Sequence, residues 1–219
     1  MSKITALVVQ KRNKDRVNVY LDGKFGFSLT MLEAFKLKKG QTISDQDLIR
    51  LKVQDEKEVA HERVLKFLSY RPRSVAEVRR KLSEKRISEA IIDEEIDRLM
   101  QAQLIDDRAF ASYWLENRNQ FGPRSTRALR FELRKKGVAD ADISSVLENF
   151  DEIEAAYEAA KRQLRRFTRL DARTFQKKIG DFLVRRGFSY SIAKDVIKRL
   201  WAEHDSNLND ALNADWEEE

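Results

Sequence analysis

The chain has 219 residues, of which 42% are hydrophobic and 37% are charged, and its formal net charge is +6. Seven glycines and two prolines are too few for a loop-rich β protein, so we expect a mainly helical fold. The absence of cysteine excludes disulfides and thiolate metal sites, and no run of 18 apolar residues is present to span a membrane. With no signal-peptide core at the N-terminus, we expect a cytoplasmic protein.

The charge is unevenly distributed along the chain. Residues 1–59 carry 12 Lys and Arg against 8 Asp and Glu, and residues 60–202 carry 31 against 22. Residues 203–219 carry none against 7, and we expect this acidic tail to be mostly disordered. A basic body favours a polyanionic partner, and the tail could weaken DNA binding by competing for the same surface. The alternative is that the charges only keep the protein soluble.

Residues 1–58 differ in pattern from the rest of the chain. Apolar and polar residues alternate, and Asp22-Gly23 is a strong hairpin signal, so we predict a three-stranded antiparallel sheet. The predicted strands are Ile4–Gln10, Val17–Leu21 and Phe25–Leu29. We interpret the sheet as a cap on the helical array that follows rather than as a partner-docking edge.

Two linking helices are predicted after the sheet. Thr30 and Glu33 fit a capping box for a helix that runs to Lys39. A second helical stretch begins at Ser44 and runs through Val53.

The remainder of the chain repeats itself. Pro72 and Pro123 are 51 positions apart in similar local sequences, and apolar residues recur at steps of 51 and then 50. The recurring positions are Val78, Leu82, Ile87, Ile92, Ile96 and Leu99, then Leu129, Leu133, Val138, Ile143, Leu147 and Phe150, then Ile179, Leu183, Phe188, Ala193, Ile197 and Leu200. We therefore predict three tandem three-helix, helix-turn-helix-like repeats at residues 59–103, 104–150 and 151–202.

The second helix of each repeat has a recognisable start, and two of the three have a recognisable end. Ser74, Ser125 and Asp171 are the predicted N-caps, while Gly137 and Gly187 stop the second helices of repeats two and three. Leu82, Leu133 and Leu183 should then be equivalent core residues.

Basic residues crowd the second helices. Arg127, Arg130 and Arg134 are spaced at i, i+3 and i+7 and share a face away from Leu129 and Leu133, which is typical of phosphate binding. The bland alternative is a solvated face with i, i+4 partners. The candidate nucleic-acid-binding residues are Arg71, Arg73, Arg79, Arg80, Arg124, Arg127, Arg130, Arg134, Lys135, Lys136, Lys161, Arg162, Arg165, Arg166, Arg169, Lys177, Lys178, Arg185 and Arg186.

The sequence contains no catalytic constellation. His61 and His204 are the only histidines, and we expect a structural or surface role for His61. Asp106 and Asp107 could suggest a metal-dependent nuclease, but adjacent helical residues point about 100° apart, so helix-start acids explain them better. We expect no enzymatic activity, metal, cofactor or small-molecule substrate.

The stretch from Leu104 to Val138, together with Arg71–Leu82, resembles the RecX family of bacterial recombination regulators. The shared features are a junction at Leu104–Asp107, where Ile105 replaces the leucine of the family, Phe110 with Trp114, Arg118, and Glu132-Leu133-Arg134-Lys135-Lys136-Gly137. The resemblance extends over about residues 57–200 and is weakest in repeat three. It implies a curved, elongated array that binds the RecA–single-stranded-DNA filament and modulates, usually inhibits, ATP hydrolysis and strand exchange by RecA.

A rival interpretation is a sequence-specific helix-turn-helix DNA-binding regulator, because a three-helix unit can place a helix in the major groove. Similar basic residues in three copies favour contact with the DNA backbone instead. We also expect a monomer, because the basic body repels itself.

Overall fold

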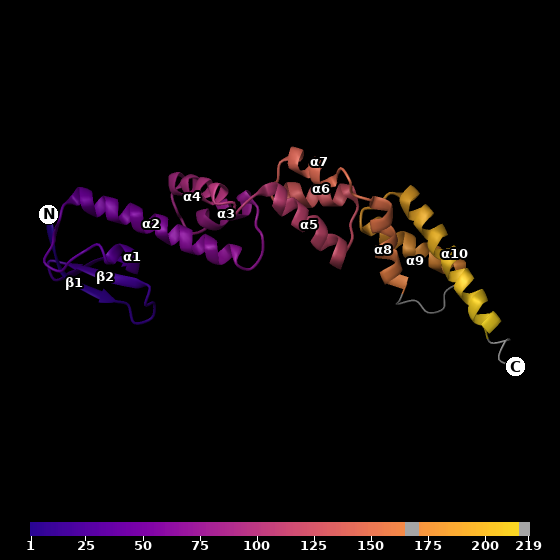
Figure 1. Ribbon diagram of the computed structural model, residues 1–219, viewed down its shortest axis with the longest axis horizontal. Helices are drawn as coiled ribbons and strands as arrows, with labels where there is room; N and C mark the ends of the chain where they lie inside the picture. Colours follow the sequence, from indigo (N-terminus) through magenta and orange to yellow (C-terminus); the bar gives the residue numbers. More distant parts are fainter. Residues whose placement is uncertain (165–170, 215–219) are drawn as a thin grey trace. The chain divides into compact units, whose positions relative to one another are not determined.

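The computed structural model describes residues 1–164 and 171–214, and the side chains of residues 1–164 and 171–203. The fold is mainly helical, with a small antiparallel sheet near the N-terminus (Figure 1). The chain divides into two compact units, Met1–Ile105 and Asp106–Glu219. Among the described residues, no helix is long and apolar enough to cross a membrane.

The sheet has four strands in the order β3-β2-β1-β4, and all pairs are antiparallel. The three predicted strands are confirmed as β1 (Ser2–Val9), β2 (Arg16–Leu21) and β3 (Lys24–Thr30). The fourth strand, β4 (Thr42–Ile43), was not predicted, because two residues carry no periodic pattern. Asp22 and Gly23 form the predicted hairpin turn with φ angles of 50° and 82°.

The first predicted linking helix is much shorter than expected. Helix α1 spans only Met31–Ala34, and the side chain of Thr30 makes no cap hydrogen bond. The predicted capping box is therefore wrong, because Thr30 is the last residue of β3 and pairs with Arg16 in the sheet. Glu33 is buried and forms an ion pair with Lys36.

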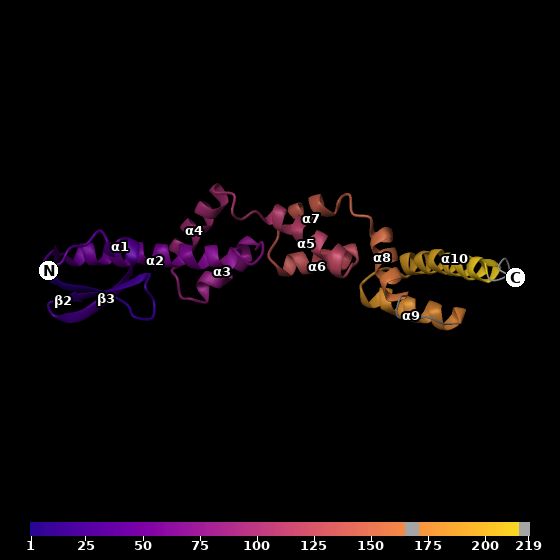
Figure 2. The same cartoon turned by 60° about the horizontal axis from the view of Figure 1, so that its bottom comes forward.

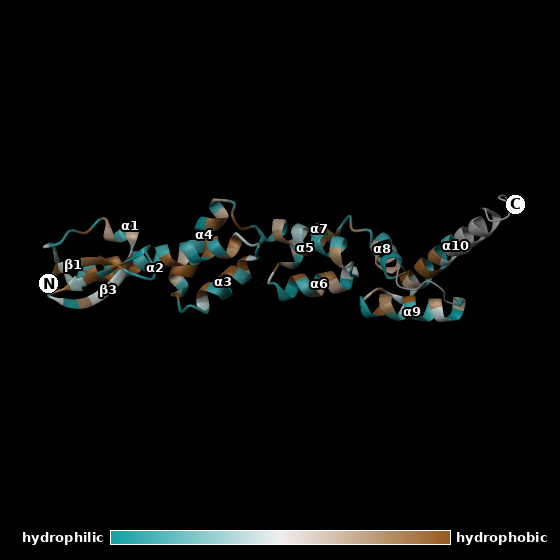
Figure 3. Cartoon of the chain, turned by 90° about the horizontal axis from the view of Figure 1, so that it is seen from below, coloured by the Kyte–Doolittle hydropathy of each residue, from teal (hydrophilic) through white to brown (hydrophobic). Residues whose placement is uncertain are grey.

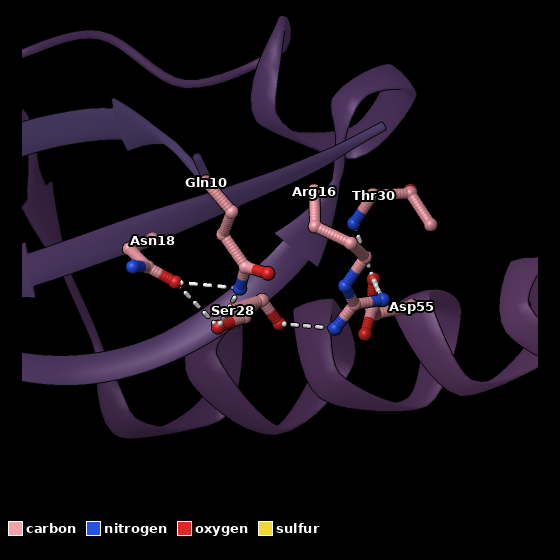
Figure 4. Close-up of polar contacts among 6 residues, drawn as sticks. All are labelled: Gln10, Arg16, Asn18, Ser28, Thr30 and Asp55. Atoms are coloured by element: carbon pink, nitrogen blue, oxygen red, sulfur yellow. Dashed lines mark hydrogen bonds and ion pairs between the residues drawn. The ribbon is translucent and has the colours of Figure 1, made fainter. Parts of the chain in front are cut away.

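Helix α2 (Asp45–Leu68) joins the sheet to repeat one. The second linking helix and the first helix of repeat one were predicted separately, but they form this single helix. Asp55 on α2 accepts hydrogen bonds from Arg16 Nη1 at 3.1 Å and from the amide of Thr30 at 2.6 Å (Figure 4). The sheet core also packs against Leu48 and Leu51 of α2. The sheet thus covers the N-terminal half of a helix whose C-terminal half belongs to repeat one.

A polar cluster lies on the strands near the same junction. Gln10 Nε2 donates to Asn18 Oδ1 at 2.8 Å and to Ser28 Oγ at 3.1 Å (Figure 4). Arg16 Nη2 donates to the carbonyl oxygen of Ser28 at 3.1 Å. These bonds tie the end of β1 to β2 and β3.

Nine helices, α2 to α10, form three three-helix repeats within the described part of the chain, as predicted. Repeat one adds α3 (Val75–Ser83) and α4 (Glu89–Gln101) to α2. Repeat two consists of α5 (Asp107–Phe121), α6 (Thr126–Lys135) and α7 (Asp140–Leu147). Repeat three consists of α8 (Glu152–Leu164), α9 (Ala172–Arg185) and α10 (Tyr190–Ala214), which pack against one another (Figure 2).

Each repeat has its own hydrophobic core. Leu82, Leu133 and Leu183 are all fully buried and belong to three separate clusters, one in each repeat. Figure 3 shows hydrophobic and hydrophilic bands on the helices of the repeats, as expected for amphipathic helices. The periodic apolar residues therefore build the core that the sequence predicted.

The second helices of the three repeats begin with the same kind of N-cap. The side chains of Ser74, Ser125 and Asp171 accept hydrogen bonds from the amides three residues later, at 3.1, 3.1 and 3.0 Å. These three predicted N-caps are confirmed. After each helix, a residue with positive φ turns the chain: Arg86 at 59°, Gly137 at 83° and Gly187 at 93°.

Repeats two and three touch where α9 ends and α6 begins. The amide of Ser125 donates to the carbonyl oxygen of Arg186 at 3.3 Å. A Cβ atom on Gly187 would lie 2.6 Å from Ser125 Oγ, so only glycine fits at this position.

Helix α10 continues to Ala214. The helix therefore occupies most of the segment 203–219 for which the sequence predicted disorder. Residues 215–219 lie outside the described part of the chain.

Candidate nucleic-acid interface

Three of the four predicted cations of repeat one have local structural partners, and the first two are Arg71 and Arg73. Arg71 forms a bidentate ion pair with Glu77, with N–O distances of 2.9 and 3.1 Å, and Glu77 is only 4% exposed. The guanidinium of Arg73 lies 3.8 Å from the centre of the Phe67 ring. A buried bidentate pair and a stacked guanidinium both support the turn between α2 and α3.

Arg79 is also engaged by its own repeat. It contacts Glu89 at 2.9 Å and Asp93 at 2.5 Å, both on α4. The hydrogen bond that Arg79 donates to Asp93 is the main reason that the pKa of Arg79 is raised. Arg80 is exposed and has no carboxylate partner among the described residues, so it is the one predicted cation of this repeat that remains open to a ligand.

A second basic surface of repeat one was not predicted. A cavity of about 260 Å³ between α2 and α3 is lined only by cationic and aromatic residues: Arg63, Lys66, Phe67, Tyr70, Lys81 and Lys85. Its four cations have no carboxylate partner in the described part of the chain, and Tyr70 is 72% exposed. The i, i+3 spacing of Arg63 and Lys66 and the i, i+4 spacing of Lys81 and Lys85 are the signals that could have revealed it.

The predicted stripe on α6 is divided between two directions. Arg134 binds Asp140 at 2.7 and 3.1 Å, and Arg130 donates to Ser144 at 2.9 Å, so both side chains turn towards α7. The hydrogen bond from Arg134 is the main cause of the lowered pKa of Asp140. The spacing of the three arginines did not reveal these partners, because α7 supplies them from beyond the turn, and the binding role of the stripe remains a prediction.

A different face of α6 remains open. Arg127, Phe131 and Lys135 are spaced at i, i+4 and i+8, and all three are exposed. Neither cation has a carboxylate partner within the described residues, and Phe131 is 68% exposed. We call Arg127, Phe131 and Lys135 the open α6 face.

Glu132 lies at the centre of a cluster that contains the remaining predicted cations of repeat two. Its Oε2 accepts hydrogen bonds from Trp114 Nε1 at 2.8 Å and from Arg118 Nε at 2.7 Å. Arg124 Nε lies 4.0 Å from Glu132 Oε1, and Arg118 and Lys136 lie 4.7 and 5.0 Å from the centre of the Trp114 ring. The predicted residues Arg124 and Lys136 thus belong to an aromatic–cation cluster between α5 and α6.

The predicted cations on α8 have local partners. The pKa of Lys161 is raised, chiefly by a hydrogen bond with Tyr157. Arg162 donates to the carbonyl oxygen of Gln120 in repeat two and lies 3.9 Å from Glu158. The other three predicted residues of this segment, Arg165, Arg166 and Arg169, lie outside the described residues.

Arg186 sits at the junction of repeats two and three. It donates to the carbonyl oxygen of Pro123 at 3.1 Å and lies 4.6 Å from the centre of the Phe182 ring. Burial, followed by the nearby charges of Arg124, Arg118 and Arg162, lowers the pKa of Arg186. Its contacts indicate a structural role, whereas Lys177, Lys178 and Arg185 are exposed on α9.

A basic hollow of repeat three lies between α9 and α10. It has a volume of about 460 Å³, and its cations are Arg173, Lys177, Lys194 and Lys198. Tyr190 at its edge is 78% exposed. We call this hollow the repeat-three groove. Only Lys177 was predicted, although the i, i+4 pairs Arg173/Lys177 and Lys194/Lys198 would have indicated it.

The structure also shows the surroundings of the residues that the sequence offered for metal or acid–base chemistry. They contain no group of three or more His, Cys, Asp or Glu side chains that could hold a metal ion. His61 Nδ1 lies 2.8 Å from Glu95 Oε1, and Glu95 is 5% exposed, which fits the predicted structural role. Asp106 caps α5 by accepting from the amides of Arg108 and Ala109 at 2.7 and 3.0 Å, as expected of a helix-start acid.

Four family models match the chain in order. They are the regulatory protein RecX N-terminal domain (residues 2–44) and the first, second and third RecX three-helix domains (residues 60–99, 106–147 and 151–197).

Proteins named RecX are similar to the chain over most of its length. The chain is 32% identical over 210 residues to the regulatory protein RecX of Bacillus licheniformis, covering 94% of this chain and 80% of that protein. It is also 32% identical over 212 residues to the RecX protein of Bacillus subtilis, with 94% and 80% covered.

Solved structures agree with the sequence relatives. A crystal structure of a regulatory protein RecX matches with a TM-score of 0.62 and 29% identity, covering 90% of this chain and 98% of that one. RecX from Lactobacillus salivarius matches with a TM-score of 0.58 and 27% identity, covering 67% and 97%.

Proposed function

Because the chain belongs to the RecX family of regulatory proteins, we propose that it binds the RecA filament on single-stranded DNA and inhibits it. The inhibited activities are ATP hydrolysis, strand exchange and filament growth. Membership of the family supports a regulatory role. We infer further that the regulated partner is RecA on single-stranded DNA.

One observation supports contact with single-stranded DNA in particular. In each repeat an exposed aromatic ring lies among cations that have no carboxylate partner in the described part of the chain. The rings are Tyr70, Phe131 and Tyr190, with exposures of 72%, 68% and 78%. Proteins that hold single strands combine cations for the phosphates with aromatic side chains on which bases stack.

The same arrangement argues against a sequence-specific helix-turn-helix regulator. Base readout in the major groove needs free arginine, asparagine or glutamine side chains on one recognition helix. On α6, Arg130 and Arg134 are engaged by Ser144 and Asp140 of α7. The cations that stay unpaired are spread over several helices, which suits contacts with the DNA backbone.

A RecA ATPase assay on single-stranded DNA tests the proposal. Adding the protein should lower the rate of ATP hydrolysis in proportion to its occupancy of the filament. The double variant Arg127→Gln/Lys135→Gln removes both charges of the open α6 face and should weaken inhibition several-fold, because each lost cation removes one phosphate contact.

Arg134→Gln is the matched control for the single variant Arg127→Gln, because each removes one arginine charge, but the charge of Arg134 is already paired with Asp140. It should leave inhibition nearly unchanged. The proposal is wrong if the wild-type chain neither binds the filament nor alters ATP hydrolysis. A strong preference for one duplex sequence would favour the rival interpretation.

A further inference from the structure

The groove between the second and third helices differs among the three repeats. In repeat one, Arg79 of α3 bridges it by contacting Glu89 and Asp93 of α4. In repeat two, Arg130 donates to Ser144, and Arg134 pairs with Asp140. Side chains of the second helix therefore close this groove in both repeats.

Repeat three lacks every part of that bridge. In the 51- and 50-residue register, Gly180 takes the place of Arg79 and Arg130. Tyr190 takes the place of Glu89 and Asp140, and Lys194 takes the place of Asp93 and Ser144. The bridging arginine and the acidic residues that would receive it are absent together, so the groove remains open.

The open groove has a strongly positive lining. Arg173 and Lys177 line it from α9, and Lys194 and Lys198 line it from α10, against a single carboxylate, Asp181. None of the four cations has a carboxylate partner within the described residues. The volume of about 460 Å³ lies in the range of small-ligand sites, about 300–1,000 Å³.

Gly180 leaves room in the floor of the groove. A Cβ atom added there would meet only Ile197 Cδ1, at 3.6 Å, which is an ordinary van der Waals contact. Gly180 has no positive φ, so a larger residue is sterically allowed and would project a side chain where repeats one and two have arginine.

We propose that the repeat-three groove holds one nucleotide of a single-stranded nucleic acid. The phosphates on either side of this nucleotide contact the four cations of the groove, and its base stacks on the exposed ring of Tyr190. The inference rests on the proposed function, because it assigns a contact within the same DNA-binding activity. Charge complementarity favours an anion, and an exposed ring beside the cations favours an unpaired base, whose face is free only in a single strand.

The first test uses Gly180→Glu and Gly180→Gln in the full chain. The two side chains have the same size, but the glutamate adds a negative charge beside Lys177, one turn earlier on α9. Affinity for a labelled oligothymidylate of about 20 nucleotides, measured by fluorescence anisotropy at low salt, should fall about tenfold for Gly180→Glu. Gly180→Gln should lose much less, and thermal melting should show that both variants fold, because both residues favour helix over glycine.

The second test separates the base from the phosphates. Tyr190→Ala should weaken oligothymidylate binding by roughly tenfold, the cost of one lost stacking contact, whereas Tyr190→Phe keeps the ring and should bind like the wild type. Because Tyr190 is 78% exposed, neither change should affect folding. A 5-iodouracil oligonucleotide should form a photo-crosslink in the peptide that contains Tyr190.

The outcomes distinguish this inference from the proposed function. If the wild-type chain binds oligothymidylate and inhibits RecA but all four variants bind equally well, the groove inference is overturned and the proposed function stands. If Gly180→Glu weakens binding, Tyr190→Ala does not, and an oligoglutamate peptide competes as well as the oligonucleotide, the groove takes acidic peptides and the nucleotide assignment is wrong. If the wild-type chain leaves RecA activity unchanged, the proposed function itself fails.

Discussion

At the scale of single residues, the position of each carboxylate decides which cations are available to a ligand. Asp140 lies beyond the turn after α6 but binds Arg134, and Glu77 is buried against Arg71. The two arginines were predicted to bind DNA because the sequence shows their number and spacing but not their partners. Arg127 has no such partner in the described part of the chain and remains a candidate.

Glu132 gives a prediction in which stability and binding move in opposite directions. It accepts hydrogen bonds from Trp114 and Arg118 and has 22% side-chain exposure. Glu132→Gln should lower the free energy of unfolding by about 1–2 kcal/mol, because hydrogen bonds to a charged acceptor are weakened. Affinity for single-stranded DNA should rise, because Arg118 and Arg124 lose their counter-charge. Thermal melting and anisotropy on one preparation measure both effects, and weaker DNA binding would contradict the prediction.

Thr30 carries an unsatisfied hydroxyl inside the first unit. It is 2% exposed, and its Oγ1 has no hydrogen-bond partner, while its amide donates to Asp55. Thr30→Val replaces the hydroxyl with a methyl group of similar shape and should raise the free energy of unfolding by about 1 kcal/mol. Urea denaturation measures the change. The control Thr30→Ser keeps the hydroxyl and removes the methyl group, so it should be less stable than the wild type.

At the scale of helices and strands, the sequence predicted what depends on local chemistry. The N-caps Ser74, Ser125 and Asp171 are confirmed, because a short polar side chain can bond its own helix wherever the helix lies. Elements that depend on distant partners were missed. Strand β4 exists because β1 pairs with it, and α1 is short because Thr30 belongs to β3.

The sequence also located the candidate binding residues only in part. It identified Arg127, Lys135 and Lys177 as cations, and these lie on open surfaces. It missed Lys194 and Lys198 because the predicted basic surfaces centred on the second helices, whereas these two residues lie on α10, the third helix of its repeat. The pairs Arg173/Lys177 and Lys194/Lys198 come together only because α9 packs against α10.

The turns after the second helices allow a paired test of backbone conformation. Arg86 has a φ of 59° at the position where repeat two has Gly137 with a φ of 83°. A left-handed conformation costs roughly 1–2 kcal/mol for a residue with a Cβ atom, so Arg86→Gly should raise the free energy of unfolding by about 0.5–1 kcal/mol. Gly137→Ala should lower it by about 1 kcal/mol. Chemical denaturation of the two variants measures both; the same sign for both would contradict the argument.

At the scale of the whole molecule, the open cations are distributed over all three repeats and are not gathered in one of them. They lie on α2, α3, α6, α9 and α10. Under the proposed function, each cation that contacts a phosphate releases a counterion, so we expect the affinity for single-stranded DNA to depend steeply on salt.

This arrangement predicts a specific salt dependence. If the chain contacts about six phosphates of a single strand, log Kd should rise with log salt concentration with a slope of roughly 4. Binding to oligonucleotides of unrelated sequence should differ little, because phosphates carry no sequence information. Anisotropy titrations at several salt concentrations measure the slope. A slope near zero would show that DNA is held by uncharged contacts instead.

Because α2 belongs to both the sheet unit and repeat one, it predicts the order in which these parts fold during translation. The apolar face of the sheet is covered partly by Leu48 and Leu51, and Arg16 is held by Asp55, so a nascent chain that ends at β4 has no finished N-terminal unit. We therefore expect the N-terminal unit to be complete only after residues up to Asp55 have been synthesised. The same helix then carries Ala60 and Val64 into the core of repeat one. Because one helix serves both cores, we expect the sheet to order the first half of α2 and the second half to offer a surface on which α3 and α4 pack, so that this unit folds from its N-terminal end.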